Sequence, residues 1–147
     1  MSIDMNLHRV FTETLATLPP ATRAKIEAFW RKQRVPEHDG RLVPVVLKKP
    51  NLGVGSLCAN TDGVIFNFKS AVVDQAPEDI LRICIAHELA HAYRAAELCM
   101  PLNDATAYGH SSRNCEEGAA DKLTKEWGFD RARLLDWLAQ NETALGL

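Results

Sequence analysis

The chain has 147 residues, of which 46% are apolar and 24% are charged, and its formal net charge is −2. This length predicts a single domain over residues 1–147, with enough apolar side chains to bury a core. The balanced charge argues against a nucleic-acid partner, which usually requires a basic domain, and the apolar runs are too short for a membrane span of about 18 residues or more.

The beginning of the chain and its cysteines bear on the compartment. The first residues contain no apolar stretch flanked by positive charge, so we expect no secretory signal peptide and a cytoplasmic location. Cys58, Cys84, Cys99 and Cys115 form no CxxC pair, so a structural zinc site built on cysteines is not expected. We predict that all four are free thiols in a reducing environment.

The first part of the chain predicts helices followed by strands. Apolar residues recur at helical spacing before and after Pro19-Pro20, so two N-terminal helices are expected within residues 1–35. Residues 42–69 contain three short β-rich runs separated by turn-forming residues, which predicts a three-stranded antiparallel meander. In its last run, apolar residues alternate with Asn67 and Lys69, so one face of this strand packs and the other is partly wet.

The remainder of the chain predicts helices. A long helix is expected over 77–98, because Pro77 suits its first position and acidic residues follow. After a loop, a helix over 114–127 ends at Gly128, and a final helix runs to about residue 140 with Asp130 as its cap. The predicted class is therefore α+β, with a small sheet packed against the helix over 77–98.

The predicted helix over 77–98 contains the motif His87-Glu88-Leu89-Ala90-His91. Histidines at i and i+4 share a helix face and can bind one metal ion, while Glu88 lies beside the open position as a general base. A solvated surface helix is the alternative, but Arg82 and Glu88 are the only acidic or basic side chains in residues 80–93 apart from the two histidines. Such a helix is buried, and its polar groups need partners. We predict one zinc ion per chain.

A third ligand is expected on the helix over 114–127. Glu117 and Asp121 are four residues apart, so Glu117 can bind the metal while Asp121 accepts a hydrogen bond from a ligand histidine. Glu116 is the main rival and lies about 100° around the helix. Cys115 and His110 are weaker rivals.

The HELAH motif at 87–91 and the ExxAD element at 117–121 resemble the gluzincin branch of zinc peptidases. Over residues 63–128 the chain is most similar to the small ImmA/IrrE-type metallopeptidases. The resemblance implies a minimal zincin-like fold and a zinc-dependent endopeptidase that acts on a protein or peptide substrate. It also implies that the substrate adds as a strand to a sheet edge, for which we expect the outer edge of residues 63–69.

Several functional assignments remain open at this level. Tyr108, His110 and Arg113 are candidate donors to the transition state. The main alternative to a peptidase is a zinc-bearing regulatory or partner-binding module without catalysis, although such a module has no use for Glu88. A SprT-like protease acting on DNA-bound proteins is a further alternative. It expects a third histidine, for which His110 is available, and a basic accessory region, which this chain lacks.

Overall fold

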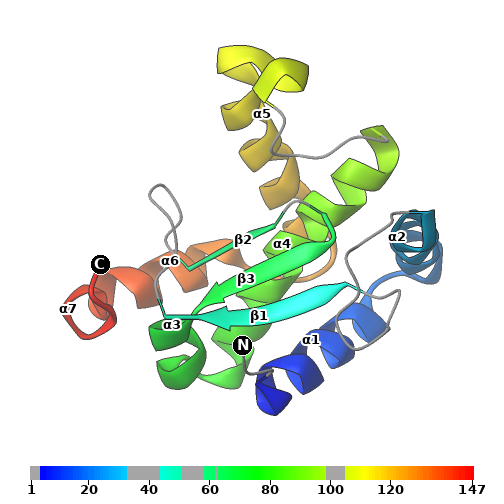
Figure 1. The fold of residues 1–147 in the computed structure, drawn as a ribbon. Helices are drawn as coiled ribbons and strands as arrows, with labels where there is room; N and C mark the ends of the chain where they lie inside the picture. The colour runs from blue at the N-terminus through cyan, green and yellow to red at the C-terminus, as the bar shows by residue number, and fades with distance from the viewer. Residues whose placement is uncertain (1–3, 33–43, 51–57, 62, 99–104) are drawn as a thin grey trace.

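The computed structural model describes residues 4–32, 44–50, 58–61, 63–98 and 105–147, and in the last range it describes side chains from Glu116 onward. These parts of the chain confirm the α+β class (Figure 1). The elements are, in chain order, α1 (Met5–Thr17), α2 (Pro20–Lys32), β1 (Val45–Lys49), β2 (Ala59–Thr61), β3 (Ile65–Lys69), α3 (Ser70–Gln75), α4 (Glu78–Leu98), α5 (Ala105–Glu126), α6 (Arg131–Gln140) and α7 (Glu142–Leu145).

The two N-terminal helices form as predicted. Asp4 caps α1 by accepting a hydrogen bond from the Leu7 backbone N–H at 2.8 Å, which satisfies one of the unpaired donors of the first turn. Leu18 ends α1 in an extended conformation, as expected for a residue that precedes a proline. Pro20 is the first residue of α2, where its missing N–H costs nothing.

The sheet is mixed, so the predicted antiparallel meander is wrong. The strand order is β1-β3-β2, and β3 pairs with a neighbour on each side. β1 runs parallel to β3, with Val45 opposite Ile65, whereas β2 is antiparallel to it, with Thr61 opposite Phe66. Alternating side chains reveal which face of a strand is buried, but they do not reveal which strand it pairs with.

One face of β3 packs into the core, as its alternation predicted. Phe66 and Phe68 are fully buried, while Ile65, Asn67 and Lys69 are partly exposed. Phe66 meets Phe11 edge-on, with 4.9 Å between ring centroids, and Trp30 edge-on at 6.0 Å. This aromatic cluster joins α1 and α2 to the sheet.

Gly63 allows the turn before β3 to lie against α4. Its φ of 97° is in the left-handed region, and a Cβ at this position would lie 3.0 Å from the Cβ of Ala95. The Gly63 carbonyl accepts a hydrogen bond from Trp30 Nε1 at 2.6 Å. Glycine is therefore required here both for conformation and for close approach.

The helix α4 is the centre of the fold. It contacts α1, α2, α5, α6 and β2, and fourteen of its residues are buried (Figure 1). Its bounds agree with the prediction, and its burial on nearly all sides accounts for its almost continuous apolar sequence. Among the described residues, no helix is both long and apolar enough to cross a membrane.

Three helical segments, α3, α5 and α7, differ from the prediction. α5 begins at Ala105, nine residues before the expected start at residue 114. Gly109 suggested a loop, but a glycine inside a helix costs only about 1 kcal/mol relative to alanine, which tertiary structure can offset. The short helices α3, between β3 and α4, and α7, after α6, were not predicted, because their six and four residues are too few to show a helical period.

Candidate metal centre

His87 and His91 present their imidazoles on one face of α4. Their spacing of one helical turn brings the two Nε2 atoms to 3.1 Å from each other. The exposed fractions of His87 and His91 are only 5% and 8%. Two buried imidazoles with adjacent nitrogens need a shared partner, because an unsatisfied buried polar group is costly.

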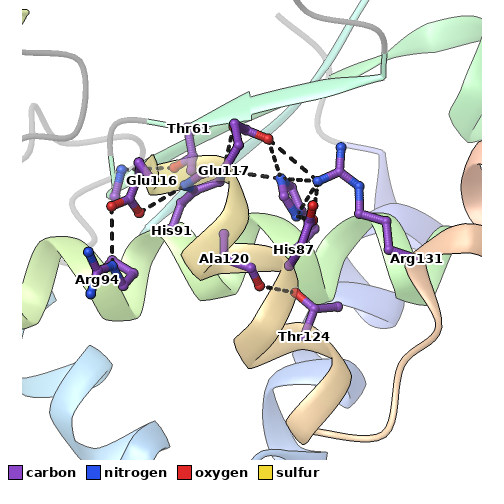
Figure 2. Close-up of polar contacts among 11 residues, drawn as sticks. Thr61, His87, His91, Arg94, Glu116, Glu117, Ala120, Thr124 and Arg131 are labelled. Carbon is purple, nitrogen blue, oxygen red and sulfur yellow. Dashed lines mark hydrogen bonds and ion pairs between the residues drawn. The ribbon is translucent and has the colours of Figure 1, made fainter. Parts of the chain in front are cut away.

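α5 brings Glu117 to these two nitrogens (Figure 2). Glu117 Oε2 lies 3.2 Å from His87 Nε2, and Glu117 Oε1 lies 3.0 Å from His91 Nε2. A tetrahedral zinc ion with bonds of about 2.0–2.1 Å holds neighbouring ligand atoms about 3.3 Å apart. The observed separations are close to that value, so two imidazoles and a carboxylate fit a zinc ion. In the described part of the chain, the ligand atoms of His87, His91 and Glu117 lie close enough together to hold one metal ion.

The outer nitrogen of each histidine faces a carboxylate from α5. Asp121 Oδ1 lies 3.1 Å from His87 Nδ1, as the i, i+4 relation to Glu117 suggested. Glu116 Oε1 lies 3.3 Å from His91 Nδ1. Carboxylates in these positions fix the tautomer of a ligand histidine by accepting a hydrogen bond from the nitrogen that does not bind metal.

Glu116 is thus placed differently from Glu117, although the two are neighbours in sequence. Glu116 is 6% exposed, and its Oε2 accepts a hydrogen bond from Arg94 Nε at 3.2 Å. The side chain of Glu117 is about half exposed. Glu117 therefore lies where it could bind a metal together with the two histidines, whereas Glu116 lies against His91.

Arg131 is a site residue that the sequence reasoning missed. It is the first residue of α6, and Figure 2 shows its guanidinium pointing toward His87. Its Nη1 donates a hydrogen bond to Asp121 and lies 3.5 Å from Glu117 Oε2. The same atom lies 2.8 Å from His87 Nδ1 and 2.9 Å from His87 Nε2. Burial alone would lower the pKa of Arg131, but the hydrogen bond to Asp121 and the charges of Asp121 and Glu117 together raise it. No motif marks this arginine, because α6 follows α5 through a turn whose direction is set by packing.

Burial and charge set the protonation preferences of the acidic residues. Burial raises the pKa of Glu88, which is 4% exposed, against the opposing influence of His91 and His87. Hydrogen bonds from His87 and His91 hold the pKa of Glu117 far below its usual range. Glu117 is therefore a carboxylate at neutral pH, as a metal ligand must be.

His91 experiences opposing influences on its pKa. Burial alone would lower it, but hydrogen bonds to Glu116 and Glu117 outweigh burial and raise the pKa to about 9. A metal ion must replace a proton at this imidazole, because only the neutral ring binds metal.

The helix packing at the site depends on one small residue. Ala120 of α5 is fully buried and lies one helical turn after Glu116, which contacts His91 of α4, so we expect a larger side chain at this position to push α5 away from α4. Gly118 plays no such part, since a Cβ built there meets nothing within 4 Å.

The three predicted transition-state donors cannot be placed. Tyr108, His110 and Arg113 belong to α5, but their side chains lie outside the described residues.

Comparisons with known proteins complete the description of the site. No family model, curated protein or solved structure matches this chain.

Proposed function

We propose that this protein is a zinc-dependent peptidase that hydrolyses peptide bonds in a protein substrate. The observation that carries the proposal is the convergence of His87, His91 and Glu117 beside a buried Glu88 on α4. The resemblance of the 87–91 and 117–121 motifs to gluzincins supports the same activity. The cytoplasmic location stays a prediction from the sequence.

The site residues divide the chemistry among them. His87, His91 and Glu117 would hold zinc, which supplies a Lewis acid that lowers the pKa of water and polarises a carbonyl. Glu88 accepts a proton on its carboxylate from the attacking water and then delivers it to the leaving amine. Burial assists this exchange because it raises the pKa of Glu88 toward the pH at which a proton is both taken and released.

The substrate path expected from the sequence needs correction. The outer edge of β3 cannot take an added strand, because β3 pairs with β1 and β2 on its two sides. β2 is an edge strand of the described sheet and contacts α4, whereas β1, the other edge strand, contacts α1 and α3. We therefore assign substrate binding to the outer edge of β2, by addition of an extended peptide strand.

The decisive experiment is the substitution Glu88→Gln. Glutamine matches glutamate in shape but does not accept a proton at neutral pH, so zinc content and fold should stay at the wild-type level while hydrolysis falls about 10² to 10⁴-fold. Glu97→Gln is the matched control, because it makes the same change on an exposed position of α4. Its activity should equal that of the wild type.

The assay has to allow for narrow specificity. Wild-type and variant proteins are co-expressed with candidate partner proteins, cleavage is scored by mass spectrometry, and zinc is measured by elemental analysis. Equal cleavage by wild type and Glu88→Gln would remove Glu88 as the base. If the zinc-loaded wild type binds partners tightly and cleaves none of them, the protein is a partner-binding module and the proposed peptidase activity is wrong.

A further inference from the structure

Two cysteine thiols meet next to the candidate metal centre. Cys84 lies on α4, three residues before His87, and is buried. Cys58 immediately precedes β2 and is partly exposed. The two Sγ atoms are 3.3 Å apart, although 26 residues separate them in sequence.

Both backbones are held in place by regular structure. The carbonyl of Cys58 accepts a hydrogen bond from the Lys69 N–H at 2.8 Å, which ties Cys58 to the end of β3. Cys84 is in the interior of a helix of 21 residues. Since β2 also contacts α4, the close approach of the two sulfurs follows from the packing of the sheet against the helix.

The spacing suits formation of a disulfide. The S–S bond is about 2.05 Å long, so the sulfurs must approach by roughly 1.3 Å, which small side-chain rotations can supply. A buried cysteine without a partner behaves as a small apolar residue. Here a second thiol lies in contact with it and reaches the surface, which a packing role does not require.

We propose that Cys58 and Cys84 form a redox-responsive dithiol that closes to a disulfide by exchange with a low-molecular-weight disulfide such as glutathione disulfide. Cys58, the more exposed of the two residues, attacks through Sγ as a thiolate and forms a mixed disulfide, releasing one glutathione thiolate. Cys84 Sγ then attacks Cys58 Sγ, the bond to glutathione breaks, and the Cys84 proton goes to the departing thiolate. Two protein thiols are oxidised and one glutathione disulfide is reduced to two thiols.

The order of the two steps follows from exposure. Contact with Cys58 and complete burial both raise the pKa of the Cys84 thiol, so Cys84 is the poorer nucleophile toward an external reagent. It acts as the resolving thiol, whose proximity to Cys58 compensates for its low thiolate fraction.

The disulfide would link the edge strand to the helix that bears His87 and Glu88. It fixes the spacing between β2 and α4 one helical turn from the candidate metal site. This inference requires neither bound zinc nor peptidase activity, so its test and the Glu88→Gln test succeed or fail separately.

The experiment uses the full chain with Cys99→Ser and Cys115→Ser, which leaves only Cys58 and Cys84. After incubation with glutathione disulfide, we expect the intact mass to fall by about 2 Da and a peptide cross-linked through Cys58 and Cys84 to appear. The Tm should rise by roughly 5–10 °C, because the bond closes a long loop, and dithiothreitol should reverse the rise.

Single substitutions test the order of events. The Cys84→Ser variant should stop at a mixed disulfide on Cys58, and the Cys58→Ser variant should react far more slowly than the pair. If the two-cysteine protein carries only a glutathione adduct, or remains fully reduced under conditions in which Cys84→Ser is modified, the proposal is wrong. A cross-link without any rise in Tm would also contradict the proposed link between β2 and α4.

Discussion

Neighbouring residues can have different roles at this site because a helix rotates by about 100° per residue. Glu117 reaches the nitrogens of His87 and His91 that face each other, while Glu116 reaches the opposite nitrogen of His91 and is held by Arg94. The sequence reasoning preferred Glu117 because Asp121 follows it by four residues. The structure adds a role for Glu116 that no spacing rule suggested.

The two glutamates should respond differently to truncation. Glu117→Ala should strip zinc, because it removes a candidate ligand. The sequence alone predicted that Glu116→Ala leaves zinc nearly intact. Because Glu116 contacts His91, we now expect this variant to fill with zinc at saturating metal but to bind it roughly 10- to 100-fold more weakly.

The measurement is a competitive chelator titration of purified protein. Glu126→Ala, an exposed position near the end of α5, is the control and should match the wild type. If Glu116→Ala loses more zinc than Glu117→Ala, Glu116 is the metal ligand and Glu117 is not.

At the scale of elements, the site depends on how closely α5 packs against α4. Ala120 is fully buried, whereas the space around Gly118 is open. The two small residues therefore differ in their role in helix packing. Ala120 permits the approach that brings Glu117 to the histidines, and Gly118 lies on the opposite, exposed side.

Enlarging these two side chains should have opposite effects on stability. Ala120→Leu overpacks the interface and should lower the free energy of unfolding by about 1–3 kcal/mol. Gly118→Ala adds a methyl group in open space on a helix and should raise it by roughly 0.5–1 kcal/mol. Urea unfolding of the metal-free proteins measures both values. Equal destabilisation by the two substitutions would contradict the packing described here.

At the scale of the whole molecule, charge pairs join the N-terminal helix to the helix that bears the site. Arg9 contacts Glu78 at 2.5 Å, and Arg82 contacts Glu13 at 2.8 Å. Hydrogen bonds from Arg82 and Arg9 lower the pKa of Glu13 and of Glu78, respectively, below their usual value of 4.5. The Arg9–Glu78 pair is exposed and the Arg82–Glu13 pair is partly exposed, so each contributes little by itself.

The pairs predict the direction of the response to acid. A carboxylate whose pKa is lowered by folding stabilises the protein above about pH 4.5, and this contribution is lost as the pH falls through its folded-state pKa. The double variant Glu13→Gln/Glu78→Gln should therefore lose less stability than the wild type on acidification from pH 5 to pH 3. Thermal unfolding across this range tests the prediction, with Glu126→Gln as the control. If the double variant has the same pH profile as the wild type, these ion pairs do not contribute to the acid response.

The sequence by itself determined the features that depend on local periodicity. The i, i+4 spacing of His87 and His91 and the relation of Glu117 to Asp121 follow from helix geometry. The C-terminal end of α1 and the start of α2 follow from the proline pair, and the buried face of β3 follows from alternation. These features need only the conformation of a short segment, so residue types at fixed spacing were sufficient to predict them.

The tertiary structure alone decided which segments meet. It placed β3 between β1 and β2, brought Arg131 to Asp121, set Glu116 against His91 and put Cys58 in contact with Cys84. Each pairing joins different elements and depends on the packing of all the elements around α4. Apolar burial drives that packing without direction, so spacing along the chain carries no record of these neighbours.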